Sequence, residues 1–157
     1  MLAPIAGGVI VYSKGVADRE EQMASALEEK DAIREVMAEY CFRLDSGEFE
    51  QMAVLFTAEG TWDTAFGKAT GRDAIAALAR DIRARAADTR PRGIHLVTNI
   101  VIALDGERAR VRSNWTVVQN GPDGPKIGSG GAYADEMTKE DGHWRFRYRK
   151  IDRFIAP

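Results

Sequence analysis

The order in which helical and strand-like segments follow one another is the feature that most constrains this fold. Apolar residues recur with helical spacing in the first half of the chain, whereas β-branched runs separated by turn signals fill the second half. Helices that precede the strands, rather than alternating with them, argue against a parallel βαβ sheet. The sequence therefore predicts an α+β fold in which helices pack against an antiparallel sheet.

Three helices are expected in the first half of the chain. The first runs from about Ala24 to Asp45 and ends before Gly47, and a short second helix covers Glu48 to Phe56. The segment from Gly60 to Gly67 is predicted to be extended, because its threonine and aromatic residues favour strands. A third helix is predicted from about Arg72 to Ala87 by the recurrence of apolar residues on one helical face.

Four strands are expected after the helices, as an antiparallel meander. Asp-Gly turns at residues 105–106 and 141–142 and a loop rich in glycine and proline at 120–125 separate them. Glycines within the third strand, at 128, 130 and 131, indicate a bulge or a strong bend. A sheet that curves around the first helix leaves a cavity at its open end, where small molecules commonly bind. The predicted strands are Ile94–Leu104, Arg108–Gln119, Ile127–Lys139 and His143–Phe154.

The length of 157 residues suits one domain, which we place at residues 23–157 after an N-terminal extension at residues 1–22. We interpret residues 1 to about 20 as a weakly ordered arm or an edge strand. The apolar start is too short to span a bilayer and lacks a basic leader, so a cytoplasmic protein is the default expectation. The net charge of −2 provides no strong field to attract nucleic acid or a membrane surface.

Residues that commonly bind metals are scarce. The single cysteine, Cys41, excludes an intrachain disulfide and a CxxC metal knuckle. A site with several histidines would need both His95 and His143, together with carboxylates. We therefore expect neither a metal nor another cofactor.

His95 and Asp45 are the main candidates for chemistry. His95 begins the first long predicted strand, and Asp45 ends the first helix at the edge of its apolar stripe. A carboxylate that accepts from one imidazole nitrogen makes the other nitrogen a better base. Taken singly, each residue also has a structural interpretation, as a packed histidine and as a helix terminator. Asn99, on the same predicted strand as His95, is included as a binding residue, whereas His143 falls at a hairpin tip.

Several large aromatic residues can form either a cavity wall or ordinary core. Such side chains supply apolar area and, in tyrosine and tryptophan, a polar group that seeks a hydrogen bond. The sequence does not decide between the two roles. The candidates for substrate binding are Tyr40, Phe56, Trp62, Trp115 and Tyr133.

Basic and aromatic residues alternate from Arg145 to Lys150. This pattern suits either a nucleic-acid strand or a half-buried strand with a solvated basic face, and the net charge favours the second. One of the arginines can still face a cavity and steady an anion. Strict alternation would place Trp144, Phe146 and Tyr148 opposite Arg145, Arg147 and Arg149.

Several of these segments resemble the SnoaL-like domain of the nuclear transport factor 2-like superfamily. The resemblance covers about residues 25 to 154 and implies a cone-shaped α+β barrel, with a bent antiparallel sheet around three helices. It also implies a dimer or trimer. The segments that carry it are 40–48, 55–62, 94–95, 130–133 and 141–146.

Within this superfamily the closest pattern resembles the scytalone dehydratase and hexachlorocyclohexane dehydrochlorinase families. Those families use an aspartate at the end of the first helix and a histidine on the first long strand, which match Asp45 and His95. A pocket tryptophan matches Trp62, and an arginine of the last strand matches Arg149. The resemblance therefore implies catalytic roles for Asp45, His95 and Arg149.

Two departures prevent the substrates of these two families from being carried over. The dehydrochlorinase lysine falls on Tyr40, and the second histidine of the dehydratase has no counterpart near Gln119. Ketosteroid isomerase is a more distant match: Tyr40 corresponds to its oxyanion-hole tyrosine, but its general-base aspartate falls on Thr64.

The expected function is that of a cofactor-independent lyase, such as a dehydratase or dehydrohalogenase, that takes a proton from a small apolar or cyclic substrate. One alternative is a non-catalytic ligand-binding or scaffold protein, like the small subunits of ring-hydroxylating dioxygenases. Another is an isomerase or an epoxide hydrolase of the same superfamily. Epoxide hydrolysis would require Asp45 and Arg149 with Asp135 or Asp152. Expected partners are a small apolar ligand and further copies of the chain, and neither nucleic acid nor a membrane.

Overall fold

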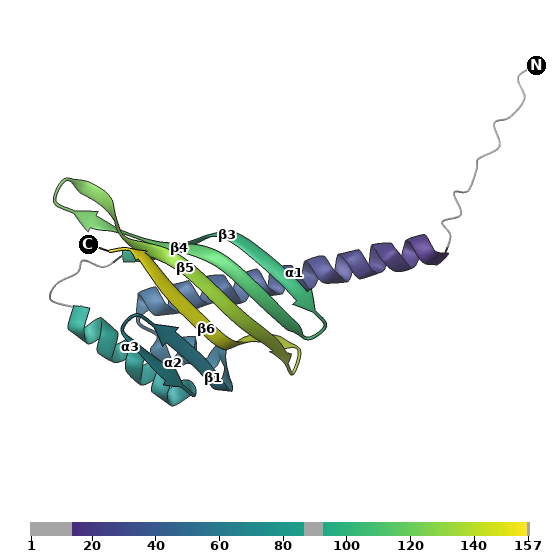
Figure 1. Cartoon of the computed structure of the whole chain (residues 1–157), viewed down its shortest axis with the longest axis horizontal. Coiled ribbons are helices and arrows are strands. Elements are labelled where there is room, and N and C mark those ends of the chain that lie inside the picture. The colour runs from purple at the N-terminus through teal and green to yellow at the C-terminus, as the bar shows by residue number, and fades with distance from the viewer. Residues whose placement is uncertain (1–13, 87–92, 157) are drawn as a thin grey trace, which may run out of the picture.

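Within the part of the chain that the structure describes, a single curved sheet of six strands packs against three helices (Figure 1). This computed structural model describes residues 14–86 and 93–156. The expected α+β class and its curved sheet are confirmed, and the sheet stays open at both edges, with the strand order β2-β1-β6-β5-β4-β3. The elements are α1 (Lys14–Ser46), α2 (Phe49–Val54), β1 (Phe56–Thr64), β2 (Gly67–Thr70), α3 (Arg72–Ala86), β3 (Gly93–Asp105), β4 (Arg108–Gly121), β5 (Gly124–Glu140) and β6 (His143–Ile155).

The predicted meander is confirmed in strands β3 to β6, which pair antiparallel in sequence order. The short β1–β2 hairpin widens the sheet because β1 pairs in parallel with β6, with Trp62 opposite Arg149. The predicted extended segment is therefore two strands joined by a turn. The loop expected at 120–125 shrinks to a turn at 122–123, because β4 and β5 continue into it.

Helix α1 begins at Lys14, earlier than the predicted start at Ala24, and its N-terminal part projects beyond the sheet (Figure 1). The edge-strand interpretation is thus wrong for residues 14–20, while residues 1–13 lie outside the described part of the chain. Met23 and Leu27 on the projecting part are exposed. The proposed domain boundary at residue 22 stays a prediction. Among the described residues, no helix combines the length and apolar character needed to cross a membrane.

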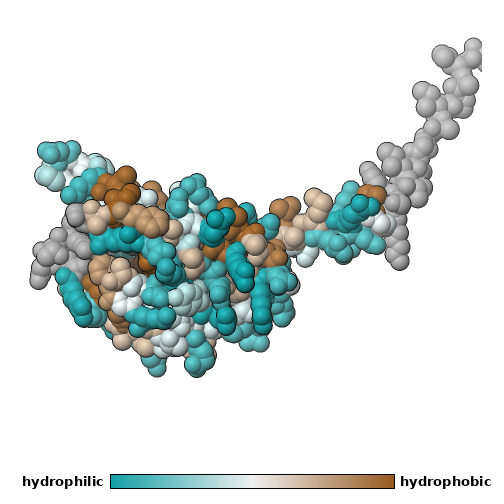
Figure 2. Space-filling model, in the orientation of Figure 1, coloured by the Kyte–Doolittle hydropathy of each residue, from teal (hydrophilic) through white to brown (hydrophobic). Residues whose placement is uncertain are grey.

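The core lies between the C-terminal half of α1 and the concave face of the sheet. Ile33, Met37 and Tyr40 on α1 are fully buried, as are Phe56 of β1 and Phe146 of β6. The three residues of α1 recur with the helical period found in the sequence, so the apolar stripe of this helix is the face that the sheet covers. Figure 2 shows further apolar surface at the end of the sheet that carries the β4–β5 hairpin, outside this core.

Bulges change which side chains of β6 face the core. Glu136 pairs with Tyr148 and Met137 pairs with Phe146, so Arg147 is an extra residue on β6. An extra residue reverses the alternation beyond it. Strict alternation predicts that Tyr148 shares a face with Phe146, and this prediction is wrong because of the extra residue. Arg149 takes the concave face instead. A bulge is also present where the glycines of the third strand indicate it, because Gly128 is left without a partner between two paired positions of β5.

Candidate functional site

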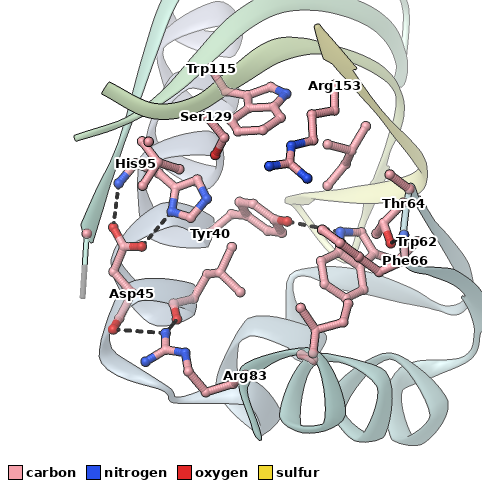
Figure 3. A pocket seen from close by; sticks show the side chains of 18 of the residues that line it. Tyr40, Asp45, Trp62, Thr64, Phe66, Arg83, His95, Trp115, Ser129 and Arg153 are labelled. Atoms are coloured by element: carbon pink, nitrogen blue, oxygen red, sulfur yellow. Dashed lines mark hydrogen bonds and ion pairs between the residues drawn. The ribbon is translucent and has the colours of Figure 1, made fainter. Parts of the chain in front are cut away.

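A cavity of about 440 Å³ opens between the C-terminal end of α1, helix α3 and the concave face of the sheet (Figure 3). Its volume is in the range that holds drug-sized ligands. Strands β1 and β3 to β6 all contribute to its wall. Most of the wall is apolar, with the aromatic side chains Phe49, Trp62, Phe66, Trp115 and Tyr133.

Asp45 and His95 meet at one side of this cavity, although 50 positions separate them in the sequence. Asp45 lies in the last turn of α1, which Gly47 ends with a positive φ of 81°. His95 lies on the concave face of β3. One oxygen of Asp45, Oδ1, is 2.5 Å from His95 Nδ1, and the other, Oδ2, accepts from the His95 backbone N–H at 2.8 Å.

These two hydrogen bonds fix the ring of His95. A carboxylate accepts hydrogen bonds, so the geometry assigns the proton to Nδ1 in the neutral ring and leaves a lone pair on Nε2. The edge of the ring that carries Nε2 faces the cavity (Figure 3). Both side chains are about one-fifth exposed, at 21% for His95 and 18% for Asp45. The pair is thus sheltered by the protein and still open to a bound molecule.

Tyr40 and Trp62 form a second polar pair in the cavity wall. Trp62 Nε1 donates to the Tyr40 hydroxyl oxygen at 2.9 Å. Burial raises the pKa of Tyr40 well above its ordinary value, against the opposing attraction of Arg149. Tyr40 therefore stays a neutral phenol, and because its oxygen already accepts from Trp62, its own O–H has a proton to donate.

Other predicted site residues fall in two groups. Trp115 and Tyr133 line the cavity, with their rings stacked at a centroid distance of 5.9 Å. Phe56 is fully buried in the core and does not line the cavity. Asn99 is exposed at a bulge of β3, with a positive φ of 55°, and it also lies outside the cavity wall.

Arg149, expected to be catalytic, does not line the cavity either. Its side chain is 0% exposed and donates to both oxygens of Asp135, at 2.8 and 2.9 Å. The rings of Tyr40, Tyr133 and Phe146 lie 4.1–4.2 Å from the guanidinium carbon. Burial on its own would lower the pKa of Arg149, but the Asp135 carboxylate, together with Tyr40 and Tyr133, raises it above its ordinary value, so the guanidinium stays charged. Arg149 therefore holds strands and helix together beneath the cavity floor.

Two arginines of the cavity wall, Arg83 and Arg153, are not among the predicted site residues. Arg153 of β6 points into the cavity (Figure 3), with its guanidinium carbon 5.7 Å from the ring centre of Phe66. Arg83 of α3 donates to the carbonyl oxygens of Leu44 and Asp45, at 2.7 and 3.2 Å, and so caps the end of α1. Basic residues in the last turn of α3, Arg83 and Arg85, are a local signal for helix capping, but nothing local marks Arg153.

Metal ligands are not gathered at this site. Within residues 14–86 and 93–156, no group of three or more histidine, cysteine, aspartate or glutamate side chains is placed to hold a metal ion. The polar groups of the cavity are instead suited to proton transfer and hydrogen bonding.

Comparisons with known proteins agree with this architecture. The model of the SnoaL-like domain family matches residues 25–150. The structure is similar to that of a variant of Rv3472, a protein of unknown function from Mycobacterium tuberculosis, with 32% identity, a TM-score of 0.71, and coverage of 86% of this chain and 75% of that one. None of the curated proteins that were compared matches the chain.

Two structures from Novosphingobium aromaticivorans are also similar. One is a nuclear transport factor 2-like protein with a cystatin-like fold, at 25% identity and a TM-score of 0.73, covering 91% of this chain and 90% of that one. The other is provisionally assigned as a scytalone dehydratase, at 27% identity and a TM-score of 0.68, covering 85% of this chain and 89% of that one.

Proposed function

This chain belongs to the SnoaL-like domain family, within the nuclear transport factor 2-like superfamily, and on that premise we propose that it is a cofactor-independent lyase. Its reaction is an elimination, of water or of a hydrogen halide, from a small and mostly apolar cyclic molecule. Asp45 and His95 form the base that starts it. The observation that carries the proposal is the 2.5 Å contact between Asp45 and His95 Nδ1 at the wall of an apolar cavity.

The reaction begins with proton transfer to His95. Its Nε2 takes a proton from a substrate carbon, and the electron pair of that C–H bond forms the new double bond. The leaving group departs from the neighbouring carbon with its own electron pair, and the proton held by His95 later passes to it or to solvent. Asp45 holds the ring in position and stabilises the imidazolium while it exists.

Tyr40 is placed to assist the departing group. Its O–H donates to the oxygen or halide as negative charge develops, and the hydrogen bond from Trp62 Nε1 strengthens that donation. Arg149 is assigned no part in this step because it faces Asp135 and three aromatic rings beneath the cavity floor.

The geometry does not favour epoxide hydrolysis. That chemistry would need Arg149 and a second aspartate beside Asp45, but Arg149 and Asp135 are fully buried against each other. Asp152 does not line the cavity, and its carboxylate pairs with Lys150 at 2.9 Å. A ligand carrier remains the second candidate, because an apolar cavity of this size can bind a molecule without transforming it.

Turnover of an elimination panel tests the proposal. Cyclic β-hydroxy ketones and halogenated cyclohexanes are incubated with the protein in heavy water, and proton NMR follows both alkene formation and carbon–hydrogen exchange. We expect His95→Gln to lower the rate about 10²–10⁴-fold. His143→Gln is the matched control, because His143 is exposed at a turn and bonds to the Asp141 carbonyl.

Equal rates for His95→Gln and the unchanged protein would refute the proposal. Binding of panel members to both proteins without alkene formation or exchange in either would favour the carrier.

We also propose that copies of the chain associate through the convex face of the sheet. Ile94, Leu96 and Val101 of β3 are exposed there, on the side opposite His95. An apolar face of this kind is commonly covered in an oligomer. Light scattering of the purified protein should give the mass of a dimer or trimer, and Leu96→Lys should reduce it; a monomeric mass would contradict this proposal.

A further inference from the structure

A carboxamide side chain lies diagonally across the sheet from His95. In the pairing of β3 with β4, His95 lies opposite Val117, and Gly93 lies opposite Gln119. Trp115, Val117 and Gln119 occupy alternate positions of β4, and all three line the cavity. Diagonal neighbours have Cβ atoms about 7–8 Å apart, within reach of a long side chain. His95 therefore has an aromatic wall on one diagonal and a polar group on the other.

Glycines on both neighbouring strands make room for the Gln119 side chain. On β3, a Cβ atom added at Gly93 would lie 2.6 Å from a methyl carbon of Val117 and 3.3 Å from the Gln119 Cβ. On β5, Gly128 is the unpaired residue of the bulge, and a Cβ atom there would lie too close to the amide carbon and oxygen of Gln119. Both glycines line the cavity. The carboxamide thus lies over the bulge of β5, at the cavity wall.

The hydrogen-bonding groups of this carboxamide are not used by the protein. Within residues 14–86 and 93–156, no group forms a hydrogen bond with the Gln119 side chain. A carboxamide has an acceptor oxygen and two donor hydrogens. A hydroxyl group can both donate and accept, whereas a halide only accepts. The chemistry of Gln119 therefore matches a hydroxyl group of a ligand better than a halide.

We propose that Gln119 is a specificity-determining residue, which binds a hydroxyl group of the ligand beside His95. This inference rests on the proposed lyase and names a feature of its substrate. The hydroxyl can donate to the amide oxygen or accept from the amide nitrogen, so it pairs with Gln119 in either orientation of the carboxamide. Binding there places the neighbouring carbon atoms of the ligand near His95, while Trp115 supplies an apolar wall for its ring.

The affinities of two matched probes test the inference. The probes are 2-tetralol and 2-fluorotetralin, in which fluorine replaces the hydroxyl group without a hydrogen to donate. Tryptophan fluorescence measures their binding to the full chain, because Trp62 and Trp115 line the cavity. Gln119→Met keeps the length of the side chain and removes its hydrogen bonds. We expect it to lower the ratio of alcohol affinity to fluoride affinity about 3- to 10-fold, as for one hydrogen bond between neutral groups.

Gly128→Ala tests the same contact from the other strand. The φ of Gly128 is outside the left-handed region, so alanine fits the backbone, but its methyl group would displace the Gln119 carboxamide. This variant should also lower the affinity ratio. The double variant Gly128→Ala, Gln119→Met should lower it no further than Gln119→Met does. Gln51→Met is the matched control, because Gln51 is exposed on α2, and its ratio should equal that of the unchanged protein.

An unaltered ratio in Gln119→Met, additive losses in the double variant, or failure of both probes to bind would overturn the inference. Ser129 is the nearest competitor for the hydroxyl, since it also lines the cavity and pairs with Val117 from β5. A ratio that falls in Ser129→Ala and not in Gln119→Met would overturn the inference in favour of Ser129.

Failure of this inference can be told apart from failure of the proposed function. The hydrogens of 2-tetralol are not acidified by a carbonyl group, so its binding is measured without turnover. A ratio that depends on Gln119, in a protein that catalyses no elimination, would leave hydroxyl selection standing and refute the lyase. Elimination that depends on His95, with a ratio that Gln119→Met does not change, would do the reverse.

Discussion

Two aspartates of this protein each form a hydrogen-bonded pair with a nitrogen-containing side chain, in surroundings that differ completely. Asp45 binds His95 at the cavity wall, where both side chains are about one-fifth exposed. Asp135 binds Arg149 beneath the cavity floor, where both side chains are 0% exposed. The first pair faces space that a ligand can enter, and the second faces the rings of Tyr40, Tyr133 and Phe146.

The difference teaches that access separates the roles of the two pairs. Both have hydrogen-bond geometry typical of charged partners. A guanidinium does not release its proton at working pH, and a group sealed among rings reaches no substrate. We therefore expect changes at Asp135 to affect folding and changes at Asp45 to affect chemistry.

Asp135→Asn should have the largest effect on folding. It leaves the charge of Arg149 buried without its carboxylate, which typically costs about 3–5 kcal/mol. Urea unfolding, followed by circular dichroism, measures this loss. The double variant Asp135→Leu, Arg149→Met should recover much of it, because neither charge then remains. A loss below about 1 kcal/mol in Asp135→Asn would show that the pair is not a structural unit.

Asp45→Asn, the same substitution at the other pair, should destabilise the fold less, by about 1–3 kcal/mol, because the amide keeps one acceptor oxygen and the site is partly exposed. Per folded molecule, Asp45→Asn should lower the elimination rate more than Asp135→Asn does. The same NMR assay, with rates normalised to folded protein, makes the comparison. Indistinguishable normalised rates for the two variants would contradict the division of roles.

Tyr40→Phe probes the residue that the two regions share. The ring of Tyr40 lies over Arg149, and its hydroxyl accepts from Trp62 at the cavity. The variant keeps the ring contact but leaves the Trp62 N–H without its acceptor, at a cost of about 1 kcal/mol. We expect the elimination rate to fall about tenfold if a hydrogen bond to the leaving group worth about 1.4 kcal/mol is lost. A rate equal to that of the unchanged protein would remove Tyr40 from the mechanism.

Glu29→Gln should have the smallest effect on the free energy of unfolding, and that effect should depend on pH. Hydrogen bonds from Lys139 and Trp144 lower the pKa of Glu29 below its ordinary value. Its stabilising contribution is therefore present above the unfolded pKa and is lost as the pH falls through the lower folded pKa. We expect Glu29→Gln to be about 1 kcal/mol less stable at neutral pH, with the difference shrinking in acid. A stability difference between the two proteins that grows in acid would contradict a lowered pKa of Glu29 in the folded state.

Much of the fold follows from local patterns in the sequence. The apolar stripe through Ile33, Met37 and Tyr40, and the turn signals at Asp105 and Asp141, identify the main helix and the meander because these features depend on neighbouring residues. The parallel pairing of β1 with β6 could not be predicted in this way. It joins segments far apart in the sequence, and no local signal specifies it.

The candidate site was predicted in part, for a similar reason. His95 and Asp45 were predicted from their positions at element ends, Tyr40 and Trp62 from their large and partly polar side chains, and all four with the help of the family resemblance. The structure brings all four to one cavity. The extra residue at Arg147 has no signature in the sequence, yet it decides which side chains of β6 face inward. Arg149 was expected at the cavity from the family resemblance alone, and Arg153 was missed because no local signal marks the bulge that sets which face it takes.

The protonation of His95 tests the central claim most directly. The chain has two histidines, so long-range proton–nitrogen NMR spectra of protein with ¹⁵N-labelled histidine can be assigned with the single variant His143→Gln. We expect neutral His95 to carry its proton on Nδ1 in the bond to Asp45 and a lone pair on Nε2, with the Nε2 signal shifting when a cavity ligand binds. A proton on Nε2, or an Nε2 signal unchanged by a ligand that fills the cavity, would contradict a base at this site.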